Sequence, residues 1–261
     1  MFSFVSQNLQ RGRGFELVFV IIVGILTYLF YRYGKRGREW EIRPLEGLEA
    51  IFEGIGRGAE MGRPIMVLPG IGDLGDPQTL AGLTVFGELT QRGAEIGVTT
   101  LSCASSSNVI AASEAIARSS YTAAGKEDLY TTGKYIRWFG GDQFSYAVGT
   151  AGTILAEKPA MIVFLGYFLM DVVLDAETGA RVGAVQIGGT LGNLAYVAMF
   201  CDYLLIGEEI YAASASISKD KMAISTLAGQ DWMKIISIGL MVVGVLFMLA
   251  RSSVILDVMR W

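Results

Sequence analysis

The chain of 261 residues contains no histidine and only two cysteines. Without histidine, Ser-His-Asp and Cys-His catalysis are excluded, and zinc sites lose their commonest nitrogen ligand. Cys103 and Cys201 lie far apart, each in an apolar stretch, which favours two buried thiols over a disulfide or a reactive thiol. The sequence therefore identifies no catalytic residue and no cofactor, and it favours a protein that is not an enzyme.

Charged residues are also scarce, at 18% of the chain against 52% hydrophobic residues. Soluble domains contain nearer a quarter charged residues, so part of the chain is expected to lie in a lipid bilayer. The 25 acidic residues outnumber the 21 basic ones. Because phosphate binding requires a basic surface, nucleic acid is not an expected partner.

The first long apolar run covers residues 15–33 and follows a tail at 1–14. At ~1.5 Å per residue the run is about 28 Å long, close to the hydrocarbon thickness of a bilayer. A cleaved signal peptide is the competing interpretation. It is disfavoured because basic residues, and no small-residue cleavage site, follow the run. The run predicts a transmembrane helix.

A second apolar run predicts a transmembrane helix over residues 231–251, before a tail at 252–261. A buried core helix is the alternative. Between the two runs lie a basic linker, 34–46, and the expected central domain, 47–230. Basic residues gather more densely after the first run than before it, which places the central domain in the cytoplasm and both termini outside.

The central region alternates between short apolar stretches and longer helical patterns. This alternation predicts an α/β fold with a mainly parallel, Rossmann-like sheet covered by helices on both faces. The expected strands are 65–68, 98–103, 161–165, 183–187 and 203–206. The expected helices begin near 48, 77, 105, 144, 190 and 208, with Gly93 capping the second. A further membrane span over 183–206 is a less favoured alternative.

A glycine-rich turn follows the first expected strand and contains Gly70, Gly72, Asp73 and Asp76. Its G-x-G-x-x-G spacing matches the dinucleotide fingerprint. However, Asp76-Pro77 predicts that the helix starts after the third glycine, and the two acids would repel a pyrophosphate. A structural turn is therefore favoured, and a ligand-binding loop is the alternative.

A second glycine-rich segment, Gly188, Gly189 and Thr190, follows the fourth expected strand, and Glu208 follows the fifth. Backbone N–H groups after such strands can receive a ligand at the carboxyl edge of a parallel sheet. Tight turns and helix-capping acids explain the same residues without a ligand. Acids gathered at this edge could also hold Mg²⁺ or Ca²⁺, although no metal site is the favoured interpretation.

Aromatic side chains crowd one short segment that includes Tyr130, Tyr135, Trp138, Phe139 and Phe144. A small satellite core beneath a loop would explain the cluster. Because aromatic residues also anchor protein interfaces, a surface for self-association is nearly as well supported.

Several motifs in matching order resemble an uncharacterised family of prokaryotic membrane proteins, DUF6754. The resemblance covers roughly residues 40–250. It is carried by residues 63–73, 76–83, 142–144, 157–160, 166–168, 202–203, 206–209 and 229–232. It implies a location in a prokaryotic cell membrane and the α/β domain already inferred. It implies no activity.

Two functions remain open at this point. The first is a membrane-anchored scaffold or accessory subunit that forms a homo-oligomer and contacts the lipid bilayer and other membrane proteins. The second is a membrane-tethered domain that binds a small ligand or a nucleotide at the carboxyl edge of its sheet.

Overall fold

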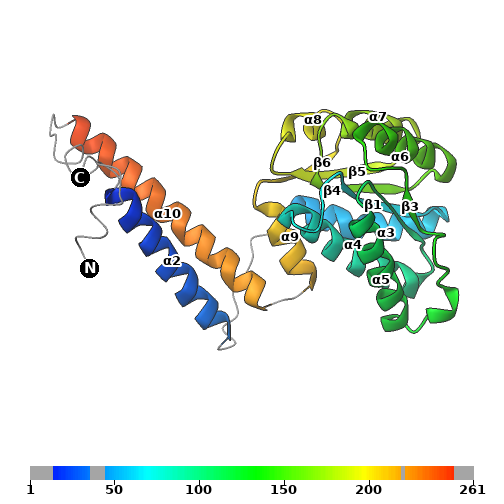
Figure 1. Ribbon diagram of the computed structural model, residues 1–261, viewed down its shortest axis with the longest axis horizontal. Helices are drawn as coiled ribbons and strands as arrows, with labels where there is room; N and C mark the ends of the chain where they lie inside the picture. Colours follow the sequence, from blue (N-terminus) through cyan, green and yellow to red (C-terminus); the bar gives the residue numbers. More distant parts are fainter. Residues whose placement is uncertain (1–13, 36–44, 219–220, 250–261) are drawn as a thin grey trace. The chain divides into compact units, whose positions relative to one another are not determined.

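The computed structural model describes residues 14–35, 45–218 and 221–249 (Figure 1). The chain divides into two compact units. One comprises residues 1–42 and 220–261, and the other comprises residues 43–219. The first unit is helical in its described part, and the second has an α/β architecture.

The helical unit pairs α2, Gly14–Lys35, with α10, Lys221–Leu249. Ser225 on α10 donates a hydrogen bond to the carbonyl of Phe30 on α2. Gly229 lies one turn later, where a Cβ would approach the Phe30 side chain to 3.2 Å. Small residues therefore allow the two helices to pack closely at this point.

Within the described residues, one helix is long and apolar enough to cross a membrane, Lys221–Leu246. The apolar helix at Leu17–Tyr33 is shorter. The C-terminal apolar helix expected from sequence is therefore present, although α10 begins ten residues before the predicted span at 231.

The α/β unit contains a six-stranded sheet in which every neighbouring pair of strands is parallel. The strands lie in the order β3-β2-β1-β4-β5-β6, which is the order of doubly wound dinucleotide-binding folds. Their bounds are Ile65–Gly70 for β1, Thr100–Ala104 for β2, Ile136–Trp138 for β3, Met161–Tyr167 for β4, Val185–Thr190 for β5 and Tyr203–Ile206 for β6. The predicted parallel α/β architecture is confirmed.

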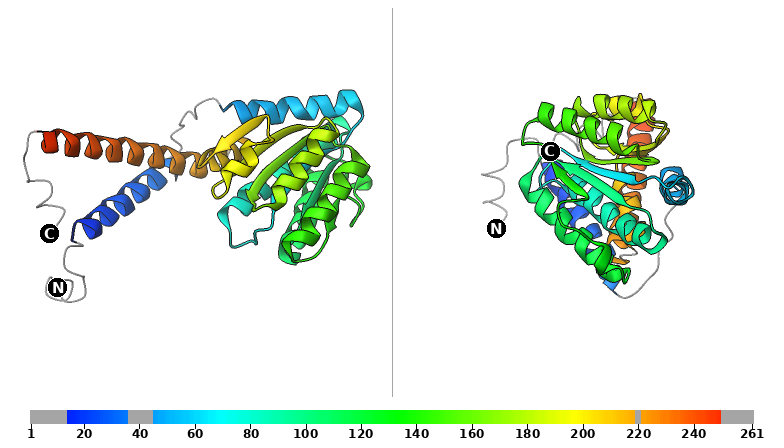
Figure 2. Two further views of the ribbon diagram at one scale, coloured as in Figure 1. Left: turned by 90° about the horizontal axis from the view of Figure 1, so that it is seen from above. Right: turned by 90° about the vertical axis from the view of Figure 1, so that its right-hand side faces the viewer.

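Helices cover both faces of this sheet, as Figures 1 and 2 show from three directions. One face carries α3, Glu46–Met61; α4, Pro77–Ile96; α5, Ser107–Ala123; and α9, Glu209–Ser218. The other carries α6, Gln143–Glu157; α7, Asp171–Arg181; and the short α8, Leu194–Ala198. A short 3₁₀ turn, η1, covers Glu127–Leu129.

Three details differ from the sequence-based expectation. The α4 helix runs through Gly93 and ends at Gly97, whose φ of 84° is the left-handed conformation of a C-terminal cap. Gly93 instead allows a close approach, because a Cβ there would lie 2.7 Å from the Val98 carbonyl oxygen. The β3 strand and the α7 helix were not predicted. As the favoured interpretation predicted, the region 183–206 forms strand, helix and strand (β5, α8 and β6), and the less favoured alternative of a membrane span there is wrong.

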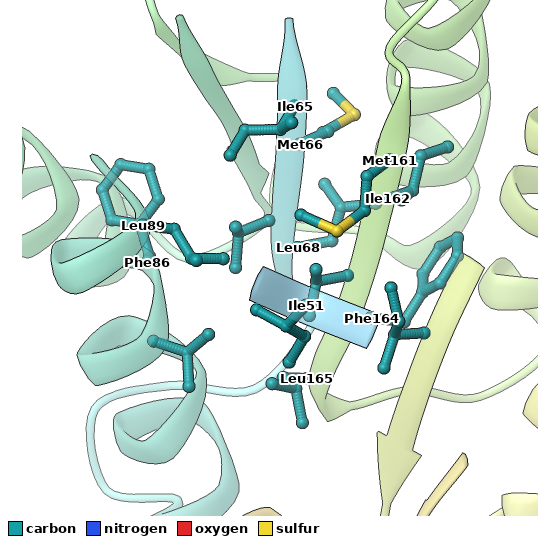
Figure 3. Close-up of a cluster of buried hydrophobic side chains, with 14 of the residues drawn as sticks. Ile51, Ile65, Met66, Leu68, Phe86, Leu89, Met161, Ile162, Phe164 and Leu165 are labelled. Carbon is teal, nitrogen blue, oxygen red and sulfur yellow. The ribbon is translucent and has the colours of Figure 1, made fainter. Parts of the chain in front are cut away.

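The core lies where β1 and β4 pair at the centre of the sheet (Figure 3). The residues of both strands except Tyr167 are buried, because helices pack on both faces. Phe86 and Leu89 of α4 and Ile51 of α3 close one side of this cluster (Figure 3). Each such side chain stabilises the fold by about 1.5–3 kcal/mol, which explains the uninterrupted apolar strands.

Candidate functional site

The carboxyl edge of the sheet begins at Gly70, where β1 ends and the first glycine-rich turn starts. Asp76 ends this turn as the N-cap of α4, and its side chain accepts a hydrogen bond of 2.9 Å from the Gln78 backbone N–H. Pro77 occupies the first position of the helix. The predicted helix start is confirmed, and Gly75, the third glycine of the motif, lies outside the helix.

The first two glycines of the turn are required by packing. Gly70 has a φ of 78°, and a Cβ there would lie 2.2 Å from the Tyr167 carbonyl oxygen at the end of β4. At Gly72 a Cβ would lie 2.2 Å from the hydroxyl of Thr79. Both glycines therefore have a structural role, independent of any ligand.

Asp73 links the turn after β1 to the turn after β2. Its exposed carboxylate accepts hydrogen bonds from the Ser106 hydroxyl at 2.7 Å, the Leu74 backbone N–H at 2.8 Å and the Asn108 amide at 3.3 Å. The Ser106 hydrogen bond contributes most to lowering the pKa of Asp73. Asp73 is thus an ionised acid held by the chain's own donors.

Gly188 and Gly189 lie inside β5, which corrects their placement in a turn after the strand. A Cβ at Gly188 would lie 2.0 Å from the Val197 side chain of α8. On the opposite face, a Cβ at Gly189 would lie 2.9 Å from both Ile210 and Leu165. The two glycines allow helices to pack tightly on both sides of the strand.

Gln78 joins the two glycine-rich segments, although no sequence pattern identified it as a site residue. Its side-chain oxygen accepts hydrogen bonds from the Thr190 hydroxyl at 3.2 Å and the Leu191 backbone N–H at 2.7 Å. Only 7% of Gln78 is exposed. The Gln78 side chain therefore bridges the two glycine-rich segments from within the protein.

The predicted acids divide among different neighbours at this edge. Asp73 faces the β2 side, whereas the charge of Asp76 acts on Tyr211 of α9, whose pKa is raised by burial and then by Asp76. Glu208 immediately precedes α9, and its carbonyl accepts backbone hydrogen bonds from that helix. Among the residues that the structure describes, no group of three or more His, Cys, Asp or Glu side chains is placed to hold a metal ion.

The aromatic segment divides between the interior and the surface. The rings of Tyr130 and Tyr135 lie 5.5 and 5.8 Å from that of Tyr121, in a satellite cluster. Phe139 packs on α6. Trp138 and Phe144 remain 57% and 80% exposed, so these two of the five aromatic residues present a large surface to solvent.

The outer face of α6 continues this exposed aromatic surface. Phe144, Val148 and Leu155 follow one another at helical spacing and are 80%, 66% and 53% exposed. The other exposed residues of the helix are Ser145, Gly152 and Ala156. No exposed residue of α6 is charged, whereas the outer face of a surface helix normally carries charged and polar side chains.

A buried polar seam lies beneath the opposite face of α6, against α7. Asp175 is fully buried, and within the described part of the chain neither of its carboxylate oxygens has a hydrogen-bond partner. The second carboxylate oxygen of Asp171 is in the same position among the described residues, and the hydroxyls of Tyr146 and Thr150 of α6 are buried in the same seam. Burial and then the Asp171 charge raise the pKa of Asp175 well above its usual range, because both disfavour the ionised carboxylate.

Two hollows of the α/β unit lie near the amino edge of the sheet. One of about 340 Å³ is lined by Arg63, Lys134, Arg137 and Glu157 among others. Arg63 donates to the carbonyls of Pro159 and Val182, and Arg137 is paired with Glu157. The second hollow, of about 1130 Å³, lies between α3 and the start of β5. Structural contacts thus occupy the two arginines at the first hollow.

Together these features define an α/β protein with a doubly wound parallel sheet and an attached pair of apolar helices. The chain belongs to the family described as Domain of unknown function (DUF6754), which matches residues 5–259. The resemblance found in the sequence is therefore confirmed. No curated protein and no solved structure matches the chain.

Proposed function

We propose that this protein is a membrane-anchored scaffold or accessory subunit that self-associates into a homo-oligomer and performs no catalysis. The observation that carries the proposal is the outer face of α6, which is exposed, mainly apolar and free of charge from Phe144 to Ala156. Large exposed apolar patches on folded proteins mark sites of association. A second copy of this chain is the partner that such a face suits best.

The proposal places the protein in a prokaryotic cell membrane through α10 and through the shorter apolar helix α2, with the α/β domain in the cytoplasm. The apolar character of both helices supports this arrangement, as does the density of basic residues after residue 31. Lys126 is exposed on the α/β domain. Lys126→Cys should resist an impermeant thiol reagent in intact cells and react after permeabilisation. Labelling in intact cells would reverse the topology.

The arrangement of the carboxyl edge also supports a scaffold. Gln78 and Asp73 join the segment after β1 to the segments after β5 and β2, because they accept hydrogen bonds of 2.7 Å from the Leu191 N–H and the Ser106 hydroxyl. In many enzymes of this fold the same edge carries the reacting groups. The sequence also contains no histidine, which is the side chain that most often acts as a general acid or base near neutral pH.

Measurement of the native mass in detergent tests self-association directly. The protein mass of the full chain should be two or more times that of the monomer. Val148→Glu introduces a charge into the outer face of α6 and should lower that mass. Ala115→Glu is the matched control, because Ala115 is equally an exposed helical residue but lies on α5. A wild-type chain that is monomeric both in detergent and in lipid vesicles would contradict the proposal.

The alternative is a small-ligand site at the carboxyl edge, between Gly70–Asp76 and Gly188–Thr190, close to Glu208. The strand order favours it, since ligands of doubly wound folds bind where β1 and β4 diverge. A ligand there would displace Gln78 from Thr190 and Leu191. Gln78→Ala should then raise the affinity for nucleotides, sugars or amines in a thermal-shift screen. If neither the wild-type chain nor Gln78→Ala shows a change in unfolding temperature with any of these ligands, the scaffold function alone remains supported.

A further inference from the structure

The α6 helix is buried on one face and apolar on its exposed face. Its inner face packs on the sheet and α7 through residues such as Tyr146 and Ile154, both fully buried. Its outer face presents Phe144, Val148 and Leu155 to solvent. Because the exposed face of a surface helix normally carries charged and polar side chains, this apolar face is expected to be covered when the protein functions.

The charges of the segment lie at its two ends and differ in sign. Asp142, the exposed N-cap residue, precedes the helix, and the exposed Lys158 follows it. Between them the only charged residue is Glu157, which is paired with Arg137. A partner that covers this face must therefore be uncharged along its middle, positive opposite Asp142 and negative opposite Lys158.

The same segment from a second copy meets these requirements when it runs in the opposite direction. With the two helices centred on Thr150, residue n of one copy lies opposite residue 300 − n of the other. Asp142 then faces Lys158, and Phe144 faces Ala156. In the middle, Val148 faces Gly152. Large side chains thus lie opposite small ones, and opposite charges meet at both ends.

We propose that α6 pairs antiparallel with α6 of a second copy across a two-fold axis near Thr150. This inference rests on the proposed function, because it assigns the surface through which the scaffold self-associates. Such an interface is isologous, since both copies contribute the same residues. The antiparallel helices also place their opposite dipole ends together.

The available area is consistent with a weak dimer that the membrane strengthens. From the exposed fractions of its side chains, the outer face offers on the order of 500 Å² per copy. The pair would bury on the order of 1,000 Å², which is the lower bound for specific interfaces. Tethering to one membrane raises the effective concentration of the second copy, and a contact of this size then becomes sufficient.

A lipid surface is a poorer partner for this face. Helices that lie on membranes carry lysine and arginine on their polar side and contact anionic lipids. The α6 helix contains neither residue, and its single charge is the acid Glu157. Attraction to an anionic membrane is therefore missing.

Disulfide cross-linking of the full chain in membranes tests the register, in a Cys201→Ser background that leaves only the buried Cys103. Co-expressed Val148→Cys and Gly152→Cys chains, distinguished by tags, should form a mixed dimer several-fold more efficiently than either chain alone. Gly152 suits this design because a Cβ there meets nothing within 4 Å. Ala115→Cys on α5 is the control and should not cross-link.

The possible outcomes separate this inference from the proposed function. Preferential self-cross-linking of Val148→Cys would indicate parallel helices and overturn the pairing. An oligomeric mass without any cross-link at α6 would also overturn it, while leaving the proposed function intact. Quenching of a fluorophore at Gly152→Cys by brominated lipids would assign the face to the bilayer instead. Chains that remain monomeric in membranes, with no cross-link at any position, would contradict both the pairing and the proposed function.

Discussion

Gln78 and Thr190, 112 residues apart in the chain, are joined by a hydrogen bond of 3.2 Å at the carboxyl edge of the sheet. The same Gln78 oxygen also accepts from the Leu191 backbone N–H. This amide therefore holds the start of α4 against the end of β5. It crosses β4, which lies between β1 and β5 in the sheet.

Gln78→Ala should lower the free energy of unfolding by about 1–3 kcal/mol, because two donors lose their acceptor in a buried position. Gln91→Ala, on the same helix but partly exposed, is the control and should change stability by less than about 0.5 kcal/mol. Urea unfolding of the detergent-solubilised chain measures both. Equal effects of the two substitutions would show that the Gln78 bridge contributes no stability.

Asp175 should make the protein less stable as the pH rises. Its pKa in the folded state is raised well above the unfolded value, first by burial and then by the Asp171 charge. The folded state therefore holds the proton more tightly than the unfolded chain. The contribution of Asp175 to the free energy of unfolding is fully present below its unfolded pKa of ~3.9. This contribution is lost as the pH rises through the folded-state pKa, by up to about 1.4 kcal/mol per pH unit.

Asp175→Asn tests this sign, because the amide keeps the neutral shape of the protonated carboxyl. It should stabilise the protein at pH 8 and have little effect near pH 4, as followed by thermal unfolding. Tyr146 and Cys103 lie in the same seam, and burial raises the pKa of both, so their ionisation at high pH should add to the loss in the parent protein. Asp73→Asn is the contrast. The pKa of Asp73 is lowered in the folded state, so its ionised carboxylate stabilises the fold, and this contribution is lost as the pH falls through the folded-state pKa. A parent protein that grows more stable from pH 5 to pH 8 would refute the role assigned to Asp175.

Two glycines with the same backbone conformation should respond very differently to alanine. Gly70 and Gly97 have φ values of 78° and 84°, so each substitution imposes about 1–2 kcal/mol of left-handed strain. At Gly97 nothing lies within 4 Å of the added Cβ, whereas at Gly70 the Cβ would lie 2.2 Å from the Tyr167 carbonyl oxygen. Gly70→Ala should therefore destabilise the protein several times more than Gly97→Ala in denaturant unfolding. Similar losses would show that the ends of β1 and β4 separate easily.

The central strands could be predicted from the sequence alone, because burial on both faces requires continuous apolar runs such as Ile65–Leu68. The β3 strand escaped prediction because it has three residues and Arg137 at its centre. The α7 helix escaped because Asp171 and Asp175 occupy its buried face, where sequence patterns require apolar side chains. Buried acids of this kind become visible only when neighbouring elements are placed around them.

The candidate site was predictable in its local features only. Asp76-Pro77 predicted the start of α4 through the geometry of a single turn. Gly188 and Gly189 indicated a turn, since adjacent glycines weaken a strand, but close helices on both faces leave no room for side chains. The contact between Gln78 and Thr190 depends on two distant segments meeting, for which a single sequence carries no signal.

Reversal of the charge at Lys158 should weaken the proposed α6 pairing without affecting the fold. In the antiparallel arrangement residue 158 of each copy faces Asp142 of the other. Lys158→Glu therefore puts an acid opposite an acid at both ends of the helix pair. Exchanging two attractive exposed pairs for repulsive ones should cost about 1.4 kcal/mol, which raises the dissociation constant roughly tenfold. Energy transfer between labelled chains in vesicles measures this, and the effect should shrink at high salt because surface charges are screened. Lys126→Glu makes the same charge change at an exposed position just before η1, away from α6 in the sequence. It should leave the dissociation constant unchanged. If both substitutions act equally, net charge governs the association and the Asp142–Lys158 contact is refuted.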